Sequence, residues 1–233
     1  MSRDLTVVVL VEGQTEHGFV KEVLAPYWGQ RGIFVQAPIY RTQVDMRSGR
    51  VHKGGDIRFA RFAKQLVALL RQRPDTIVAS FVDFYGISEW PGLEQVAKGQ
   101  MPAEMAATLC EAAKMALETL CPGISVGRRY VPFVAVHEFE ALLFSDAPIL
   151  SAMLHVSQSA IEEVLEESGS PEAIDNSPQT APSKRLEAWT GGTYRKTAKG
   201  VSIAAAIGID TMRLACPNFD AWLTSIETRQ LEA

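Results

Sequence analysis

The sequence contains little cysteine and lacks the paired spacings on which disulfide frameworks and zinc ribbons depend. Its 233 residues include three cysteines, Cys110, Cys121 and Cys216, and no C-x-x-C pair. We therefore expect neither a disulfide-stapled fold nor a zinc ribbon, and we expect the reducing environment of the cytoplasm. The three cysteines lie in Ala-rich or Pro-flanked contexts, which is typical of core residues rather than of nucleophiles.

Long apolar runs are also absent. No run reaches the roughly 18 to 20 residues that a membrane-spanning helix needs. The first residues lead straight into a strand-like run, without the basic region, apolar region and cleavage site of a secretory signal. The patterns G-x-x-x-x-G-K-[ST], G-x-G-x-x-G and G-x-S-x-G are missing too, so no P-loop, dinucleotide site or hydrolase elbow is indicated.

The chain has no excess of positive charge. It carries 23 Lys and Arg against 27 Asp and Glu, a formal net charge of -4. This charge excludes a protein that coats nucleic acid through an overall positive charge. The charge is uneven, however: residues 41–64 carry a net +5, residues 184–199 a net +4, and residues 138–175 nine acids and no Lys or Arg. The two basic segments predict a groove for a polyanion, and the alternative is two ordinary solvated surfaces.

The N-terminal two thirds of the chain alternates strand-like and helix-like segments. Residues 5–11 form a continuous β-branched run, as in a strand buried on both faces, and Thr15 is the expected N-cap of the following helix. Three further strands are expected at 33–39, 76–82 and 131–136, and amphipathic helices at 57–70 and 102–120. This alternation predicts an α/β fold built on a parallel sheet.

The pattern changes after about residue 147. Short helices are expected at 159–167, 184–189, 203–207 and 219–226, separated by Gly, Ser and Pro breakers. We predict two parts, an α/β core over residues 1–147 and a helical C-terminal region over residues 148–233 that docks on the core.

Acidic residues follow three of the predicted strands. Glu12 follows the first strand, Asp83 the third, and Glu138 the fourth, with Glu140 two residues further on. The carboxyl ends of parallel strands meet at one edge of a sheet, where ligands bind. Clustered carboxylates are costly unless a cation neutralises them, and Mg²⁺ or Mn²⁺ suits an all-oxygen site. The chemistry that most often needs this arrangement is phosphoryl transfer.

Each acid also has a structural alternative. Glu12 would cap the helix that follows it, where the helix dipole favours an anion. Asp83 would stabilise a turn before Gly86, and Glu138 and Glu140 would be exposed helix residues. His137 is either a ligand or general base, or a hydrogen-bonded residue at a helix start. The joint position of the acids at strand ends favours a functional cluster.

The ordered set of motifs resembles a family of stand-alone Toprim-like proteins. Toprim is the topoisomerase–primase fold, which also occurs in OLD-type nucleases. Val-Glu-Gly-Gln-Thr-Glu at 11–16 is similar to the first Toprim motif, and Val-Asp at 82–83 to the start of the second. The other segments that carry the resemblance are 84–86, 137–144, 181–186 and 194–196.

The resemblance implies a Toprim-like sheet with a divalent-metal site that cuts or rejoins nucleic acid. Glu12 takes the position of the general acid/base or metal-site glutamate, and Asp83 that of the first Asp of the D-x-D motif. The second Asp position is Tyr85, so Glu138 or Glu140 is expected to supply the missing oxygen. Relatives of this kind work beside an ABC/SMC- or AAA-type ATPase in bacterial anti-phage systems.

The basic residues of the C-terminal region acquire roles from the same resemblance. A positive side chain near the scissile phosphate stabilises the charge of the transition state, which we assign to Lys184 and Lys196. Nucleic-acid contacts are expected from Arg185, Arg195 and Lys199, with Tyr85 stacking on a base. The alternative is that the basic residues pair with the acidic 138–175 segment and that the tyrosine only packs.

Three functions follow from these expectations. The first is a Mg- or Mn-dependent nuclease that acts on DNA or RNA with a partner ATPase in phage defence. The second keeps the chemistry but cleaves tRNA or other RNA as a toxin. The third is a non-catalytic adaptor that binds nucleic acid or an ATPase through a degenerate Toprim site, which Tyr85 favours.

Overall fold

The computed structural model describes residues 5–40, 57–97, 99–136, 138–174 and 179–229. In these residues the main sheet has the strand order β2-β1-β4-β6, and every pair of neighbours is parallel. The strands are β1 (Leu5–Val11), β2 (Ile33–Gln36), β4 (Ile77–Asp83) and β6 (Tyr130–Ala135). Two short strands, β3 (Ile57–Arg58) and β5 (Ile87–Ser88), pair separately. The predicted α/β class and parallel sheet are confirmed.

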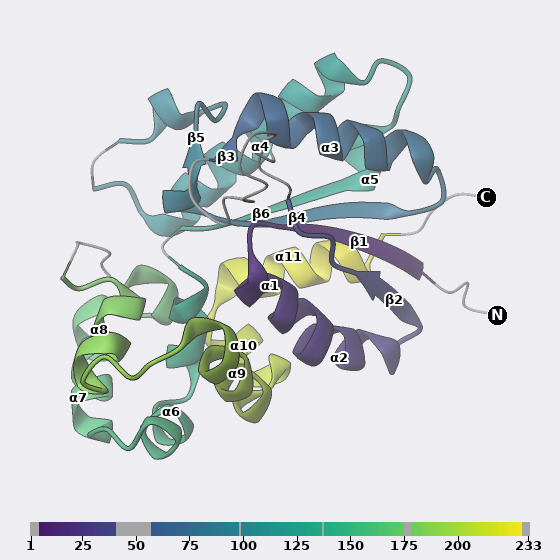
Figure 1. The fold of residues 1–233 in the computed structure, drawn as a ribbon. Helices are drawn as coiled ribbons and strands as arrows, with labels where there is room; N and C mark the ends of the chain where they lie inside the picture. The colour runs from purple at the N-terminus through teal and green to yellow at the C-terminus, as the bar shows by residue number, and fades with distance from the viewer. Residues whose placement is uncertain (1–4, 41–56, 98, 137, 175–178, 230–233) are drawn as a thin grey trace, which may run out of the picture.

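Helices cover both faces of the main sheet (Figure 1). One face packs against α3 (Phe59–Gln72), α4 (Pro102–Leu120) and α5 (Val126–Arg129). The other packs against α1 (Gln14–Phe19), α2 (Ala25–Gly29) and the C-terminal helices. Alternate residues of β1, β4 and β6 enter the two cores, which explains why β1 and β4 are almost continuously apolar.

The C-terminal helices are continuous with the second core. After the 3₁₀ segment η4 (Phe139–Ser145), the helices are α6 (Ala147–Leu154), α7 (Gln158–Ser168), α8 (Pro182–Trp189), α9 (Val201–Ile207), α10 (Ile209–Ala215) and α11 (Pro217–Glu227). Trp222 of α11 stacks on Phe133 of β6 with ring centroids 5.1 Å apart, and its Nε1 donates to the Val131 carbonyl. Helix α11 therefore packs directly on the sheet and joins the helical region to it, while the division at residue 147 stays a prediction.

Most of the predicted elements are present, with local corrections. The strand expected at 33–39 ends at Gln36, after which only an isolated bridge joins Ile39 to Val11. The helix expected at 57–70 begins at Phe59, because residues 57–58 form β3. The predicted N-cap Thr15 is wrong: Gly13 is the N-cap, and the Glu16 side chain accepts from its backbone N–H in a capping box.

The sequence predicted core cysteines and no membrane-spanning helix, and the structure describes both features. Cys121 and Cys216 are buried, Cys110 is half-buried, and all three are free. Among the described residues, no helix is both long and apolar enough to cross a bilayer.

Candidate functional site

Two of the predicted acids meet where β1 and β4 end. Glu12 follows the last residue of β1, and Asp83 is the last residue of the neighbouring strand β4. The backbone N–H of Asp83 donates to Glu12 Oε2 at 3.2 Å, and the Glu12 N–H donates to the Phe81 carbonyl at 3.3 Å. Parallel pairing thus fixes both carboxylates at one edge of the sheet, as the sequence predicted.

Gly86 creates the space for the Glu12 carboxylate. It is the last residue of the short 3₁₀ segment η2 (Phe84–Gly86), which begins directly after Asp83. A Cβ at position 86 would lie 2.3 Å from Glu12 Oε2 and 2.4 Å from Oε1. Because real Cβ contacts are never this short, the Glu12 carboxylate rests against bare backbone here, and any larger residue would displace it.

The Asp83 carboxylate is poorly compensated. Its Oδ1 is buried and has no hydrogen-bond partner among the described residues. Burial raises the pKa of Asp83 well above its usual value, and the charges of Glu16, Glu12 and Glu140 raise it further, with Lys196 opposing them. A buried acceptor without a partner costs free energy, which marks this atom for a ligand or a proton.

Glu16 is a member of the cluster that the sequence analysis did not single out. It is buried in the first turn of α1, and burial followed by the charge of Glu12 raises its pKa against its backbone hydrogen bonds and Lys196. Its Oε2 accepts from the Gly13 N–H at 2.9 Å. The signal was available, since a glutamate three residues after the turn glycine is a capping box.

The acids that follow β6 lie at the start of η4 and face the C-terminal helices. Glu138 accepts two hydrogen bonds from Ser183 of α8, from the backbone N–H at 2.9 Å and from the hydroxyl at 3.0 Å. Glu140 is only 1% exposed, so the alternative of an exposed helix residue is wrong. Burial raises its pKa to about 7, although Lys196 lowers it.

Lys196 joins these two carboxylates. Its Nζ lies 3.2 Å from Glu140 Oε2 and 3.4 Å from Glu138 Oε1, while its side chain keeps 40% exposure. Burial opposes its charge, but Glu140, Glu138 and Asp83 outweigh that effect and raise its pKa. Lys196 is therefore a firmly charged group in contact with both the carboxylate cluster and solvent.

Tyr194 closes the cluster from the C-terminal side. Its hydroxyl donates to Glu140 Oε1 at 3.4 Å. Burial raises its pKa, and the charge of Glu140 raises it further, so it stays a neutral donor. A Cβ at Gly200 would lie 2.7 Å from this hydroxyl, so that glycine lets the tyrosine reach Glu140.

Two predicted site residues, Lys184 and Arg185, pair with groups outside this cluster. Lys184 is exposed and pairs with Glu187 of its own helix at 2.8 Å, and Arg185 Nε donates to the Thr180 carbonyl. Tyr85 is 54% exposed and makes an edge contact with Phe84.

The two basic segments do not meet in the described residues. Arg61 and Lys64 lie on α3, on the opposite face of the sheet from the C-terminal helices (Figure 1). Residues 41–56, which hold four of the basic residues of the first segment, and His137 lie outside the described residues. Arg195 precedes the segment η6 (Lys196–Gly200), Lys199 belongs to it, and both line a surface pocket together with Tyr194.

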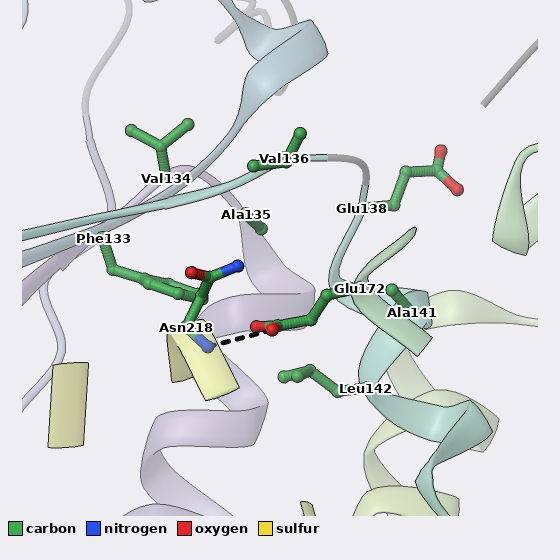
Figure 2. A pocket seen from close by; sticks show the side chains of 9 residues that line it. All are labelled: Phe133, Val134, Ala135, Val136, Glu138, Ala141, Leu142, Glu172 and Asn218. Atoms are coloured by element: carbon green, nitrogen blue, oxygen red, sulfur yellow. Dashed lines mark hydrogen bonds between the residues drawn. The ribbon is translucent and has the colours of Figure 1, made fainter. Parts of the chain in front are cut away.

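A small cavity of about 20 Å³ near the end of β6 is lined by Glu138 of the cluster and by Glu172 and Asn218. Glu172 accepts from the backbone N–H groups of Asn218 and Phe219 at 2.9 and 3.0 Å, which satisfies the N-terminus of α11. Figure 2 shows the Glu138 carboxylate pointing away from Glu172 and Asn218. The cavity has room for about one water molecule.

The cluster therefore has two halves. Glu12 and Asp83, with Glu16 beside them, form an acidic half, whereas Glu138 and Glu140 are neutralised by Lys196. Across the described part of the chain, no three His, Cys, Asp or Glu side chains are spaced to hold a metal ion without other ligands. Any cation bound here needs ligands from water or substrate in addition to the carboxylates.

Fold and site define an α/β protein with a carboxylate and lysine cluster at the carboxyl ends of its parallel strands. Residues 11–227 match the family described as "Domain of unknown function (DUF4276)", and the chain belongs to that family. No curated protein and no solved structure matches the chain. The matched region contains every residue of the cluster.

Proposed function

We propose that the chain is a divalent-metal-dependent phosphodiesterase that cleaves nucleic acid at the strand-end cluster. The observation that carries this proposal is the buried, unpartnered Oδ1 of Asp83 beside the Glu12 carboxylate. A structural role would satisfy this oxygen with a donor, whereas a cation site leaves it open. The similarity of residues 11–16 and 82–83 to Toprim motifs supports the same reading.

The residues present fit a magnesium or manganese ion held by few protein ligands. Mg²⁺ is usually bound by one or two carboxylates, with water and substrate phosphate completing its shell. Glu12 and Asp83 supply that pair, and the repulsion that raises the pKa of Asp83 falls when a cation is near. We do not assign Glu138 and Glu140 as ligands, because Lys196 and Ser183 already occupy their oxygens.

The remaining groups hold and orient a phosphate. When bound, the cation supplies charge neutralisation at the phosphate and activation of water. Lys196 presents a positive charge at the solvent side of the cluster, where it stabilises the negative charge that develops during cleavage. Glu138, Glu140 and Tyr194 hold the Lys196 ammonium in place, and Ser183 fixes Glu138.

The direct test is a cleavage assay on single- and double-stranded DNA and RNA with Mg²⁺ or Mn²⁺. We expect product with the natural protein, and only the background seen with chelator when Glu12→Gln is used. Glu111→Gln on α4, which removes an exposed carboxylate far from the cluster, is the matched control. Undiminished cleavage by Glu12→Gln would remove the proposal, and the consumed substrate decides between the DNA nuclease and the RNA-cleaving toxin.

A substitution at Gly86 tests the placement of Glu12 without changing any charge. In Gly86→Ala the new Cβ displaces the Glu12 carboxylate, which is the flexible end of its side chain. We expect metal affinity to fall by about 10–100-fold, as when support of a metal ligand is removed, with little loss of stability. Gly29→Ala, where the added Cβ meets nothing within 4 Å, is the control for calorimetry and thermal unfolding. Equal metal affinity in both variants would contradict the placement.

A second candidate is a non-catalytic binding module. It is favoured by Tyr85 at the second Asp position of the motif and by the lack of a three-ligand metal group in the described residues. This candidate predicts oligonucleotide binding without cleavage under any metal condition. Binding that persists in Glu12→Gln while cleavage is absent from the natural protein would favour it.

The partner ATPase and the role in phage defence belong to the proposal through the Toprim resemblance. The sequence contains no P-loop motif, the usual apparatus for ATP hydrolysis, and a partner that supplies this function is consistent with that. We expect cleavage to become ATP-dependent only when an ABC/SMC- or AAA-type ATPase is present. Cleavage that is indifferent to ATP and to such a partner would separate the enzyme from this context.

A further inference from the structure

A surface pocket of about 480 Å³ lies beside the cluster, between the end of α6 and η6. Its volume is within the range of small-molecule sites. The polar residues around it are His155, Thr190, Thr193, Tyr194, Arg195, Lys199 and Ser202. Met153, Leu154 and Ala198 supply an apolar part, so the pocket combines charged, hydrogen-bonding and apolar surfaces.

The charged side chains that line the pocket favour an anionic ligand. Arg195 and Lys199 both line it, and none of its lining residues is acidic. In the described part of the structure, neither cation pairs with a carboxylate. Arg195 NH1 donates to the carbonyls of Gly192 and Tyr194, both at 3.0 Å, which fixes the side chain near the pocket. A fixed guanidinium beside an ammonium is a suitable phosphate contact.

The hydroxyl groups of the pocket select hydrogen-bond donors. The Thr193 hydroxyl donates to the Thr190 carbonyl at 2.8 Å, and the Ser202 hydroxyl donates to the Ala198 carbonyl at 2.9 Å. Their protons are therefore engaged, and their lone pairs are available to accept. The hydroxyl and amino groups of a nucleotide supply such donors at a distance from its phosphate.

The pocket shares a wall with the carboxylate cluster. Tyr194 lines the pocket, and its hydroxyl donates to Glu140. Lys196, the next residue after Arg195, contacts Glu138 and Glu140. A ligand in the pocket thus lies next to the groups that would meet a phosphodiester at the cluster.

We infer that this pocket binds a nucleotide unit of a nucleic-acid strand, next to the phosphodiester that lies at the cluster. The inference rests on the proposed function for the identity of the strand. Arg195 and Lys199 contact the phosphate of that unit, Thr193 and Ser202 accept from its sugar or base, and the apolar residues pack against the base.

The test is equilibrium binding of labelled 12-nucleotide DNA and RNA single strands, in chelator so that no cleavage occurs. Arg195→Gln with Lys199→Gln should weaken binding at least about tenfold, and flatten the slope of log K against log salt by about 0.7, for the one phosphate that both residues contact. The control pair Arg71→Gln with Lys114→Gln removes the same charge from an exposed position on α3 and a half-buried position on α4. Equal losses in both pairs would overturn the inference.

Two further measurements keep the result unambiguous. Ala198→Phe fills the pocket without changing charge, so it should weaken strand binding while leaving the fold intact by circular dichroism; unchanged binding would overturn the inference. Inorganic phosphate that competes as well as an oligonucleotide would overturn it as well, because the site would then hold a free anion. Strand binding through the pocket in a protein that never cleaves supports this inference while removing the proposed function.

Discussion

Asp83→Asn will stabilise the protein in the absence of metal and will remove metal-dependent cleavage. The substitution deletes a buried charge whose pKa is raised by burial and by Glu16, Glu12 and Glu140. We expect the free energy of unfolding at neutral pH to rise by about 1 kcal/mol, the size typical of a single stabilising substitution. Cleavage should fall by about a thousandfold or more, as for a residue that acts as part of a catalytic unit.

The informative result is that Asp83→Asn gains stability and loses cleavage. Urea unfolding in chelator at neutral pH measures the stability, and the cleavage assay measures the activity. Glu111→Gln, at an exposed ion pair on α4, should change stability by less than about 0.5 kcal/mol and leave cleavage intact. If Asp83→Asn destabilises the metal-free protein, Asp83 is a structural residue and its buried oxygen has a partner in solution.

Glu140→Gln will remove a large part of the pH dependence of stability. The pKa of Glu140 is raised in the folded protein from 4.5 to about 7, first by burial. Between these values the folded state binds more protons than the unfolded state, so the natural protein loses stability as pH rises. The difference corresponds to about 3 kcal/mol, at about 1.4 kcal/mol for each pH unit. Glutamine does not titrate, so this loss disappears.

The measurement compares urea unfolding at pH 4.5 and pH 7.5, in chelator, for the natural protein and the variant. Asp83 and Glu16 also have raised pKa values and contribute with the same sign, so the difference between the two proteins reports the titration of Glu140 together with its effect on the pKa of Asp83. Glu172→Gln is a demanding control, because burial raises the pKa of Glu172 as well, while its carboxylate accepts from Asn218 and Phe219 and not from the residues of the cluster. Identical slopes in the natural protein and Glu140→Gln would show that Glu140 is not buried as a neutral acid.

Local patterns predicted the sheet because its strands are short, apolar and β-branched. Residues 5–11 and 76–82 were predicted as strands close to the observed β1 and β4, and the strand-end acids Glu12 and Asp83 do come together. Parallel pairing alone is enough for that, since it aligns the carboxyl ends of neighbouring strands. The family match gives the extent of the family domain, residues 11–227, but it assigns no activity to it.

The partners of the second half of the cluster could not be predicted, because they depend on how distant helices pack. Lys184 and Lys196 have similar local contexts, but only Lys196 contacts the strand-end acids, because η6 brings its side chain to Glu138 and Glu140. The contact between Ser183 and Glu138 could not be predicted either, because it depends on where α8 begins in space. Propensities describe such helices but do not position them.

The raised pKa values of the buried carboxylates also indicate a functional rather than a stabilising role. Asp83 and Glu16 are held with raised pKa values, while Glu140 needs Lys196 beside it. Stable cores avoid such arrangements, and proteins keep them mainly where a ligand uses them. This is why we place the metal at Glu12 and Asp83, the half of the cluster that Lys196 does not neutralise.

The most direct test of this account is a calorimetric titration of Mg²⁺ and Mn²⁺ into the natural protein, Glu12→Gln, Asp83→Asn and Glu111→Gln. The account predicts one site of millimolar or tighter affinity in the natural protein and in Glu111→Gln, weakened at least about tenfold in the other two. Absence of binding to the natural protein, or equal binding to all four proteins, would contradict it.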